Sequence, residues 1–206
     1  MSLDGFTAGP DQSLENPLGV GGMQLHDWLR VLAVWRREHG DGGGETNAST
    51  AVIEEADRNV GAIIMGRNMF GGGSGPWGTE PWNGWWGDDP PFHRPVFVLT
   101  HHPREPLEML GGTTFTFVTD GIHSALAQAQ AAAGGADIAI SGGAGVARQY
   151  LAAGQLDEIL IHLVPVLLGD GARLLGGPEL AAVRLEQLQA VEAPGVTHLK
   201  YRVVRG

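Results

Sequence analysis

A run of small and apolar residues between positions 137 and 171 constrains the fold more than any other part of the chain. Residues 137–141 are short and apolar, which is typical of a buried strand. The sequence GGAG at 142–145 then interrupts the strand with no side chain larger than a methyl group. A helix is predicted over residues 146–153, and residues 159–168 are a second apolar run of strand character. Strand, glycine bend, helix and strand together predict a right-handed βαβ unit.

The glycine bend at residues 142–147 is a candidate phosphate site. Glycine lets the backbone approach a ligand closely, and the first turn of the following helix offers N–H donors and a partial positive charge. A phosphate-bearing cofactor fits such a bend. A tight strand-to-helix turn that binds nothing explains the same residues, because a short glycine run is a weak motif. Both interpretations stay open on spacing alone.

The composition limits the partners of the chain. Its 206 residues fit one domain over positions 1–206, and 43% hydrophobic against 17% charged residues indicate a soluble globular protein. No segment reaches the ~20 apolar residues that cross a bilayer, and the net charge of −10 argues against a general affinity for nucleic acid or anionic membrane. The absence of cysteine excludes disulfides and thiolate metal sites and fits a reducing cytoplasm. An anionic cofactor therefore needs a locally positive site.

The histidines do not suggest a metal site. His101 and His102 are adjacent at the end of a predicted strand, and in an extended chain neighbouring side chains point to opposite sides. No second histidine at helical spacing and no partner carboxylate accompanies them, so we expect no bound metal.

A second glycine turn carries a cation. Residues 61–65 (GAIIM) have the composition of a buried strand, and Gly66-Arg67-Asn68 follow directly, where the chain enters a helix. An arginine at this point can bind a phosphate through a bidentate contact. The simpler alternative is a surface arginine that caps the helix or pairs with an acid.

The remaining pattern alternates strands with helices. Residues 2–8 are interpreted as a short strand that contains Asp4, although an Asp-Gly turn explains the same residues. Helices are predicted over residues 23–37, 48–59 and 122–133, strands over 95–100 and 113–119, and a closing hairpin from 183–192 and 196–204. This order predicts an α/β sheet with an antiparallel edge.

The stretch from Gly71 to Arg94 is a long glycine-rich loop that carries four tryptophans. Loops of this length inside a compact domain are usually functional or mobile. The indoles can form a lid over a site, line a pocket or pack in a dimer interface. Alternatively, the loop folds on its own aromatic side chains. The four residues are Trp77, Trp82, Trp85 and Trp86.

Four blocks of the chain resemble the dihydrofolate reductase-like superfamily, in particular the reductase domain at the C-terminal end of riboflavin-biosynthesis deaminase–reductases, the RibD C-terminal domain. The blocks are Ser2-Leu3-Asp4-Gly5, Met65-Gly66-Arg67, Ser141-Gly142-Gly143-Ala144-Gly145, and the segment from Asp157-Glu158-Ile159 to Pro165-Val166-Leu167-Leu168-Gly169. Together they span nearly the whole chain, and the last block is the most specific. The resemblance implies a three-layer α/β/α fold with a mixed, mainly parallel sheet and a C-terminal antiparallel hairpin.

The same resemblance implies NADPH as the cofactor and hydride transfer to a C=O or C=N carbon of a small, heterocyclic or carbonyl substrate. The glycine bend corresponds to the pyrophosphate cradle of the family, and the Gly-Arg turn and the end of the next strand surround the 2′-phosphate. The cofactor-binding residues that it implies are Gly66, Arg67, Asn68, Thr100, His101, Ser141, Gly142, Gly143, Ala144, Gly145, Val146 and Ala147.

The resemblance also supplies two candidate catalytic residues. Asp4 is the first candidate for contact with substrate or nicotinamide, and Asp27 is the second, because folate reductases carry a carboxylate on their first helix. A buried carboxylate with a raised pKa can supply the proton. The residues from Trp77 to Trp86 would then be the lid or the pocket wall. Because relatives of the riboflavin type pair, we expect a homodimer.

The chain departs from the family pattern at two positions. Ile140 stands where riboflavin-pathway reductases carry a substrate-contacting acid, so the substrate stays open, and Met69 replaces a threonine next to the expected phosphate site. Two other functions fit the same fold. One is a nucleotide- or ligand-binding protein without catalysis, and the other is a flavin-binding oxidoreductase that uses the same glycine bend.

Overall fold

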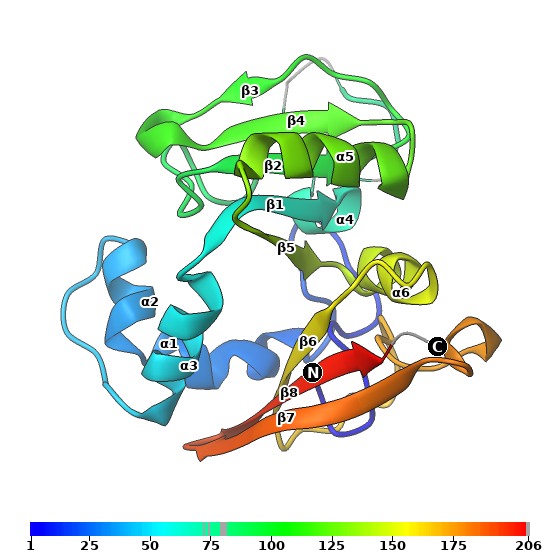
Figure 1. The fold of residues 1–206 in the computed structure, drawn as a ribbon. Coiled ribbons are helices and arrows are strands. Elements are labelled where there is room, and N and C mark those ends of the chain that lie inside the picture. Colours follow the sequence, from blue (N-terminus) through cyan, green and yellow to red (C-terminus); the bar gives the residue numbers. More distant parts are fainter. Residues whose placement is uncertain (72, 74, 79–81, 205–206) are drawn as a thin grey trace. The chain divides into compact units, whose positions relative to one another are not determined.

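The structure, a computed structural model, describes residues 1–204 except 72, 74 and 79–81. The chain divides into two compact units, of which one is Arg58–Ala147 and the other combines Met1–Asp57 with Arg148–Gly206. Each unit is built around a sheet of its own (Figure 1). A single domain over residues 1–206 stays a prediction.

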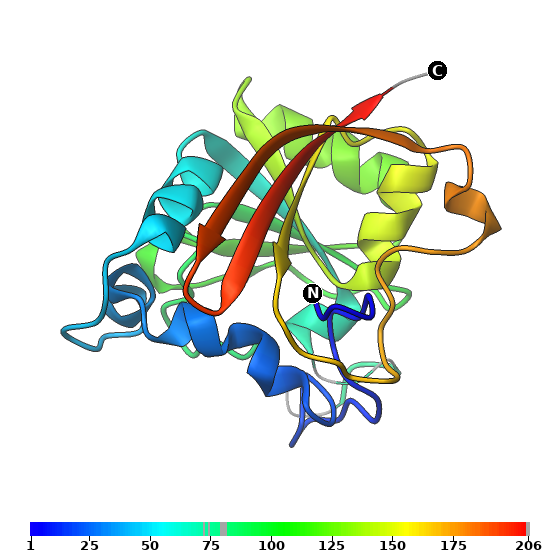
Figure 2. The same ribbon diagram turned by 90° about the horizontal axis from the view of Figure 1, so that it is seen from below.

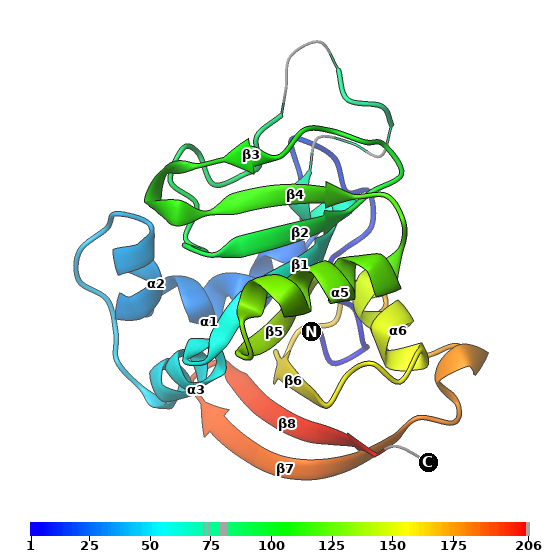
Figure 3. The same ribbon diagram turned by 45° about the horizontal axis from the view of Figure 1, so that its top comes forward.

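The unit Arg58–Ala147 holds a five-stranded sheet in the order β3-β4-β2-β1-β5 (Figure 3). Its strands are β1 (Val60–Gly66), β2 (Pro95–Leu99), β3 (Leu107–Glu108), β4 (Thr114–Val118) and β5 (Asp137–Gly142). Four strands are parallel, and only the short β3 pairs antiparallel, with β4. The helical segments of this unit are α4 (Arg67–Phe70), η2 (Leu110–Gly112) and α5 (Ile122–Ala133).

Small and β-branched residues let α5 pack closely on the strands. The helix lies against β1 and β2, and its Ala125 and Ala129 are fully buried. Gly61 of β1 lies so near the end of α5 that a Cβ there would be 2.8 Å from the carbonyl oxygen of Ala133. Successive side chains along a strand point to opposite faces of the sheet. A second apolar cluster is formed by Ile63, Met65, Phe70, Val96, Val98, Phe115 and Phe117.

The second unit holds a three-stranded antiparallel sheet in the order β6-β8-β7 (Figure 2). Its strands are β6 (Glu158–Leu163), β7 (Arg184–Ala193) and β8 (Val196–Val204). Its helical segments are η1 (Gly22–His26), α1 (Asp27–Arg30), α2 (Ala33–Glu38), α3 (Ala48–Asp57) and η3 (Pro178–Leu180). Helix α6 (Ala144–Ala152) begins in the first unit and ends in the second. Leu25, Trp28 and Leu32 form a core with Val164 and Val196.

The mixed, mainly parallel sheet and the C-terminal antiparallel hairpin confirm the predicted fold class. The helix over residues 122–133 also has the predicted bounds. No helix in the described part of the chain is long and apolar enough to cross a membrane.

Two local predictions were wrong. The helix over residues 23–37 is broken after Val31, because Val31 and Ala33 exchange backbone hydrogen bonds with Glu45 instead of continuing the helix. The expected strand at residues 2–8 is a turn, in which the N–H of Ser2 donates to the carbonyl of Phe6 at 2.8 Å. Within described residues 2–8, only Ser2 and Phe6 form isolated β-bridges, with Val164 and Arg173.

The predicted parallel βαβ unit is also corrected. Strand β5 belongs to the five-stranded sheet and β6 to the three-stranded sheet, where β6 pairs antiparallel with β8. Strand β6 ends at Leu163, before Pro165, and does not extend to residue 168. Proline has no N–H to give to a sheet, which explains the early end.

Candidate functional site

The carboxyl ends of four parallel strands meet at one edge of the five-stranded sheet. Gly66 at the end of β1 is paired with Leu99 of β2, and Leu99 is paired with Val118 of β4. On the other side of β1, Met65 is paired with Gly142 of β5. The residues that follow the four strand ends are, in order across the sheet, Thr119, Thr100, Arg67 and Gly143.

The strand order reverses next to β1. The chain runs from β1 to β2 and on to β4, and then returns through α5 to β5 on the opposite side of β1 (Figure 3). In open parallel sheets a ligand binds outside the carboxyl ends of the strands at such a reversal. The reversal therefore marks the space outside Gly66 and Gly142, which are two residues of the predicted cofactor site.

The glycine bend between β5 and α6 leaves space for a ligand. A Cβ added at Gly143 or Gly145 would meet no atom within 4 Å, and Gly142 has a φ of +122°, which side chains rarely adopt. The Gly142–Gly143 peptide bond is cis. The first turn of α6 is fixed by the N–H of Val146, which donates to the carbonyl of Gly143 at 3.0 Å. The bend thus has the bare backbone that a pyrophosphate needs.

The end of β1 packs tightly on the same bend. A Cβ at Gly66 would lie 2.8 Å from Cγ2 of Val146, so a larger residue at position 66 would push α6 away. Ser141 is exposed on β5, while Ala144 is buried at the start of α6. The pairing of β1 with β5 therefore brings Gly66 close to the glycines at 142–145.

Arg67 lies under an indole. Its guanidinium carbon is 3.1 Å from the ring centre of Trp77, and the residue is only 7% exposed. Burial and, to a smaller extent, the positive charge of Arg104 together lower the pKa of Arg67 to about 10. Stacking of this kind is worth about 0.5–2 kcal/mol and leaves the N–H groups pointing outward in the plane of the guanidinium.

Arg104 is a second cation at the same indole that the sequence did not single out. Its guanidinium carbon lies 4.9 Å from the ring centre of Trp77 and 5.2 Å from that of Phe117. Burial lowers the pKa of Arg104. The sequence gives one signal for a role of Arg104 at the site, because this arginine lies four residues after Thr100, which ends a predicted strand. Only the fold reveals that it lies beside Arg67.

The other predicted phosphate residues follow the ends of β1 and β2. Thr100 is buried, its N–H donates to the carbonyl of Val118 at 3.0 Å, and its hydroxyl oxygen accepts the N–H of His102 at 3.2 Å. His101 and Asn68 are exposed. The strand register thus brings Arg67 and Thr100 to neighbouring strand ends, with Asn68 and His101 next to them in the chain.

The tryptophan-rich loop packs on its own unit. Trp77, Trp82 and Trp86 lie against the apolar cluster of β1, β2 and β4, and Trp85 fills the space beside Gly71, where a Cβ would be 2.5 Å from its ring. The rings of Trp82 and Trp85 meet edge to face at 4.5 Å. Residues 72, 74 and 79–81 of this loop lie outside the described part of the chain. The packing agrees with a loop folded on its own aromatic side chains, with Trp77 at the strand ends.

Asp4 forms hydrogen bonds with residues 168–169, a distant segment of the same unit. Its carboxylate accepts the N–H of Leu168 at 3.1 Å and of Gly169 at 2.7 Å. The hydroxyl of Ser2, together with these two N–H groups, lowers the pKa of Asp4 to about 2. A carboxylate held ionised in this way is a poor proton donor, because a donor needs a raised pKa.

Asp27 has a different environment. It is exposed in the first turn of α1, where a carboxylate interacts favourably with the helix dipole. Neither predicted carboxylate is buried in an apolar site.

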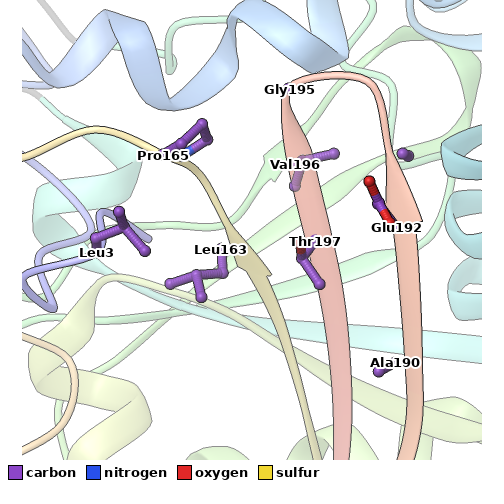
Figure 4. A pocket seen from close by; sticks show the side chains of 9 residues that line it. Leu3, Leu163, Pro165, Ala190, Glu192, Gly195, Val196 and Thr197 are labelled. Atoms are coloured by element: carbon purple, nitrogen blue, oxygen red, sulfur yellow. The ribbon is translucent and has the colours of Figure 1, made fainter.

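A cavity of about 430 Å³ lies in the second unit between the end of β6 and the β7–β8 hairpin (Figure 4). Its wall is mainly apolar, with Leu163 and Pro165 on one side and the hairpin on the other, and Glu192 is its carboxylate. None of the catalytic, cofactor-binding or pocket residues predicted from the sequence lines it. Among the described residues, no cluster of three or more histidine or acidic side chains is arranged to hold a metal.

The model of the RibD C-terminal domain family matches residues 1–199. The chain belongs to this family. This confirms the resemblance on which the sequence-based assignment rests. No curated protein sequence gives a significant match.

Solved structures share the fold of this RibD C-terminal domain protein. A Shewanella sp. PV-4 protein described as a riboflavin biosynthesis protein has a TM-score of 0.64 and 20% identity over 100% of this chain and 96% of its own. RibD of Acinetobacter baumannii has a TM-score of 0.55 and 17% identity, covering 99% of this chain and 56% of its own. The chain therefore spans just over half of the Acinetobacter protein.

A third structure is the diaminohydroxyphosphoribosylaminopyrimidine deaminase/5-amino-6-(5-phosphoribosylamino)uracil reductase of Thermotoga maritima. It has a TM-score of 0.54 and 12% identity, over 98% of this chain and 54% of its own. At these identities the likeness is one of fold. The family membership supports an oxidoreductase.

Proposed function

We propose that this protein is an NADPH-dependent reductase that transfers hydride to a C=O or C=N carbon of a small substrate. One observation carries the proposal. The bare glycine bend at 142–145 opens into unfilled space at the strand reversal, directly beside the β1 end that carries Arg67. Membership of the RibD C-terminal domain family supports a reductase at that place.

The residues present fit a phosphorylated dinucleotide. The bend at 142–145 and the first turn of α6 offer backbone N–H groups to the pyrophosphate, and the missing side chains at Gly143 and Gly145 leave room for it. Arg67 and Thr100 offer a guanidinium and a hydroxyl to the 2′-phosphate, with Asn68 and His101 as further polar partners. A cation is needed here because the whole chain carries a net charge of −10.

NADPH, when bound, supplies the hydride. The protein holds the donor and the acceptor in line and excludes water from them. The tryptophans at 77, 82, 85 and 86 are proposed to wall the site, because Trp77 lies beside Arg67 and three of the four indoles pack on the apolar cluster of β1, β2 and β4.

We propose that a group other than Asp4 supplies the proton. The clamped, ionised carboxylate of Asp4 is better suited to holding residues 168–169 in place, so its proposed contribution is to position that segment. Asp27 is the remaining carboxylate candidate. Loss of turnover with unchanged NADPH affinity in Asp27→Asn would support this role, and unchanged turnover would exclude it.

Tryptophan emission tests the proposal directly. Trp77 lies at the strand ends beside Arg67, so NADPH should quench the emission and NADH should do so only at higher concentration. NADPH should then be oxidised by at least one member of a panel of carbonyl and pterin compounds. Binding without turnover over the whole panel would favour a ligand-binding protein without catalysis. A yellow purified protein would favour a flavin enzyme, and absence of dinucleotide binding would exclude the reductase.

A homodimer is part of the proposal. Strand β7 is ten residues long and forms an edge of the described three-stranded sheet, and such an edge favours pairing with another strand. Light scattering after gel filtration should give the mass of two chains. A mass of one chain at micromolar concentration would contradict the dimer.

A further inference from the structure

Three side chains connect α3 to the antiparallel sheet of the second unit. Nδ1 of His162 on β6 lies 2.6 Å from Nδ1 of His198 on β8, and Nε2 of His198 lies 2.9 Å from the hydroxyl oxygen of Ser49 on α3. Ser49 and His198 are each only 1% exposed. Water therefore cannot replace a hydrogen bond that is lost here, and a buried polar group without a partner is costly. We call His162 and His198 the histidine pair.

The contact between the two rings exists only while at least one of them is neutral. Of two facing ring nitrogens, one must donate a proton and the other must accept it with a free lone pair. When both rings are protonated, each Nδ1 carries a proton. The bond is then lost, and two positive charges face each other at short range.

Most of the surroundings of the histidine pair are uncharged. The indole of Trp28 on α1 packs against both rings, Ser49 approaches from α3, and Val191 of β7 is the register partner of His198. The next residue on β7, Glu192, points to the opposite face of the sheet. The charged residues of α1 and α3 are all exposed, namely Asp27, Arg30, Glu54, Glu55 and Asp57.

The charged groups nearest to the histidine pair are positive or already paired. The Met1 amine donates to the carbonyl of His162 at 2.6 Å. Burial and the charge of the other ring lower the pKa of His162, and the charges of the Met1 amine and of His26 on η1 add to this. Further along the same face of the sheet, Lys200 and Glu158 form an ion pair at 2.8 Å. Within the described residues no carboxylate forms an ion pair with either ring, so none compensates a second proton.

Helix α3 is held less firmly than the other elements around the histidine pair. Strands β6 and β8 are joined along six register pairs, and Trp28 of α1 lies in the apolar core of the unit. By contrast, the buried residues of α3 are Ser49 and Val52. Segments with few buried contacts open at a low cost in free energy, so α3 is the element that yields first.

We propose that the histidine pair is a pH-sensitive switch that releases α3 from the antiparallel sheet in mild acid. Two protonated rings must separate, and His198 cannot reach solvent while α3 is in place. Opening of α3 admits water to the rings, while the ladder between β6 and β8 stays paired. Burial lowers the pKa of both rings in the closed state, so the open state binds protons more readily and is favoured as the pH falls.

Hydrogen–deuterium exchange of the wild-type protein at pH 7 and pH 4.5 tests the switch, with rates corrected for the intrinsic effect of pH. Protection of the amides of residues 48–57 should fall about 10- to 100-fold at pH 4.5, because the pKa of His162 is about 4 when closed and 6.5 when exposed. At pH 4.5 residues 196–204 should stay better protected than α3. Low urea should accelerate their exchange and leave that of α3 nearly unchanged, because a local opening exposes little surface.

Two variants separate the switch from general acid sensitivity. His162→Phe keeps a ring against Trp28 and should show a smaller fall in the protection of α3. Ser49→Ala keeps both histidines and removes their link to the helix, so α3 should be less protected already at pH 7. The matched controls are His123→Phe and Ser124→Ala in α5, which belongs to the other unit. Both should behave like wild type, and melting temperatures check that every variant folds.

Each outcome decides for or against the switch. Equal protection and equal urea dependence of residues 48–57 and 196–204 at pH 4.5 would show global unfolding only and overturn it. An unchanged protection of α3 in the wild type, or the same fall in His162→Phe as in the wild type, would also overturn it. Unchanged protection of α3 in Ser49→Ala at pH 7 would show that the histidine pair does not hold the helix. These measurements need no dinucleotide, so they are independent of the proposed reductase.

Discussion

The Nδ1 atoms of His162 and His198 lie 2.6 Å apart, and Nε2 of His198 lies 2.9 Å from the hydroxyl oxygen of Ser49. The two histidines are register partners on β6 and β8. Both rings pack against the indole of Trp28, with ring centres about 5 Å apart. A hydrogen bond between the two rings needs one Nδ1 with a proton and one without. Full protonation of both rings therefore breaks it.

This pair predicts loss of stability in mild acid. Burial, followed by the charges of His198, the Met1 amine and His26, lowers the pKa of His162 from 6.5 to about 4, and burial also lowers the pKa of His198. The unfolded chain therefore binds protons first as the pH falls. The free energy of unfolding should decline between pH 6.5 and 4, by up to about 3 kcal/mol from His162.

Urea unfolding at pH 7 and pH 4.5 measures this effect. His162→Phe keeps a ring against Trp28 and should reduce the difference between the two pH values. His123→Phe, at an exposed position of α5, should leave it unchanged. An equal pH dependence in wild type and His162→Phe would show that other groups cause the acid sensitivity.

Arg67→Ala should weaken NADPH more than NADH. The guanidinium at the end of β1 is proposed to bind the 2′-phosphate, which NADH lacks, so we expect a loss of about 10- to 100-fold for NADPH and a small change for NADH. Fluorescence titration of the tryptophans measures both. Arg58→Ala is the charge-matched control, and an equal loss for the two dinucleotides would refute the 2′-phosphate role.

Gly143→Val should abolish binding of both dinucleotides. No protein atom lies within 4 Å of a Cβ at this position, so the new side chain occupies the space proposed for the pyrophosphate. Gly42→Val is the matched control, because a Cβ at Gly42 also meets no atom within 4 Å. Calorimetry with NADPH and NADH measures binding, and a melting curve checks folding. A variant that binds NADPH like wild type would place the phosphates elsewhere.

Asp4→Asn should lower stability more than it lowers turnover. The carboxylate is held ionised by Ser2 and by the N–H groups of residues 168 and 169, with its pKa lowered to about 2. Its stabilising effect is therefore complete above pH 3.8 and is lost as the pH falls toward 2. The variant should melt at a lower temperature at pH 7, with the same shape of pH–rate profile. Disappearance of an ionisation from that profile would restore Asp4 as a proton donor.

Local sequence patterns were sufficient to predict most of the helices and strands. The bounds of α5 agree with the period of apolar residues, and the hairpin β7–β8 agrees with two alternating runs around Pro194-Gly195. Strand β1 and the Gly66-Arg67 turn were predicted because a buried strand and a glycine leave strong local signals. Most of the candidate site was named in the same way, although its function remains a prediction.

The amino-acid sequence by itself determined most of the strand and helix segments, where the two glycine turns lie, and which family the chain resembles. Only the tertiary structure decided that Arg104 lies beside Arg67, that Asp4 holds residues 168–169, and that β6 pairs with β8 instead of β5. The physical reason is distance along the chain. Propensity and periodicity act over a few neighbouring residues, whereas these contacts join residues 34 or more positions apart, and their partners are chosen by packing and strand register.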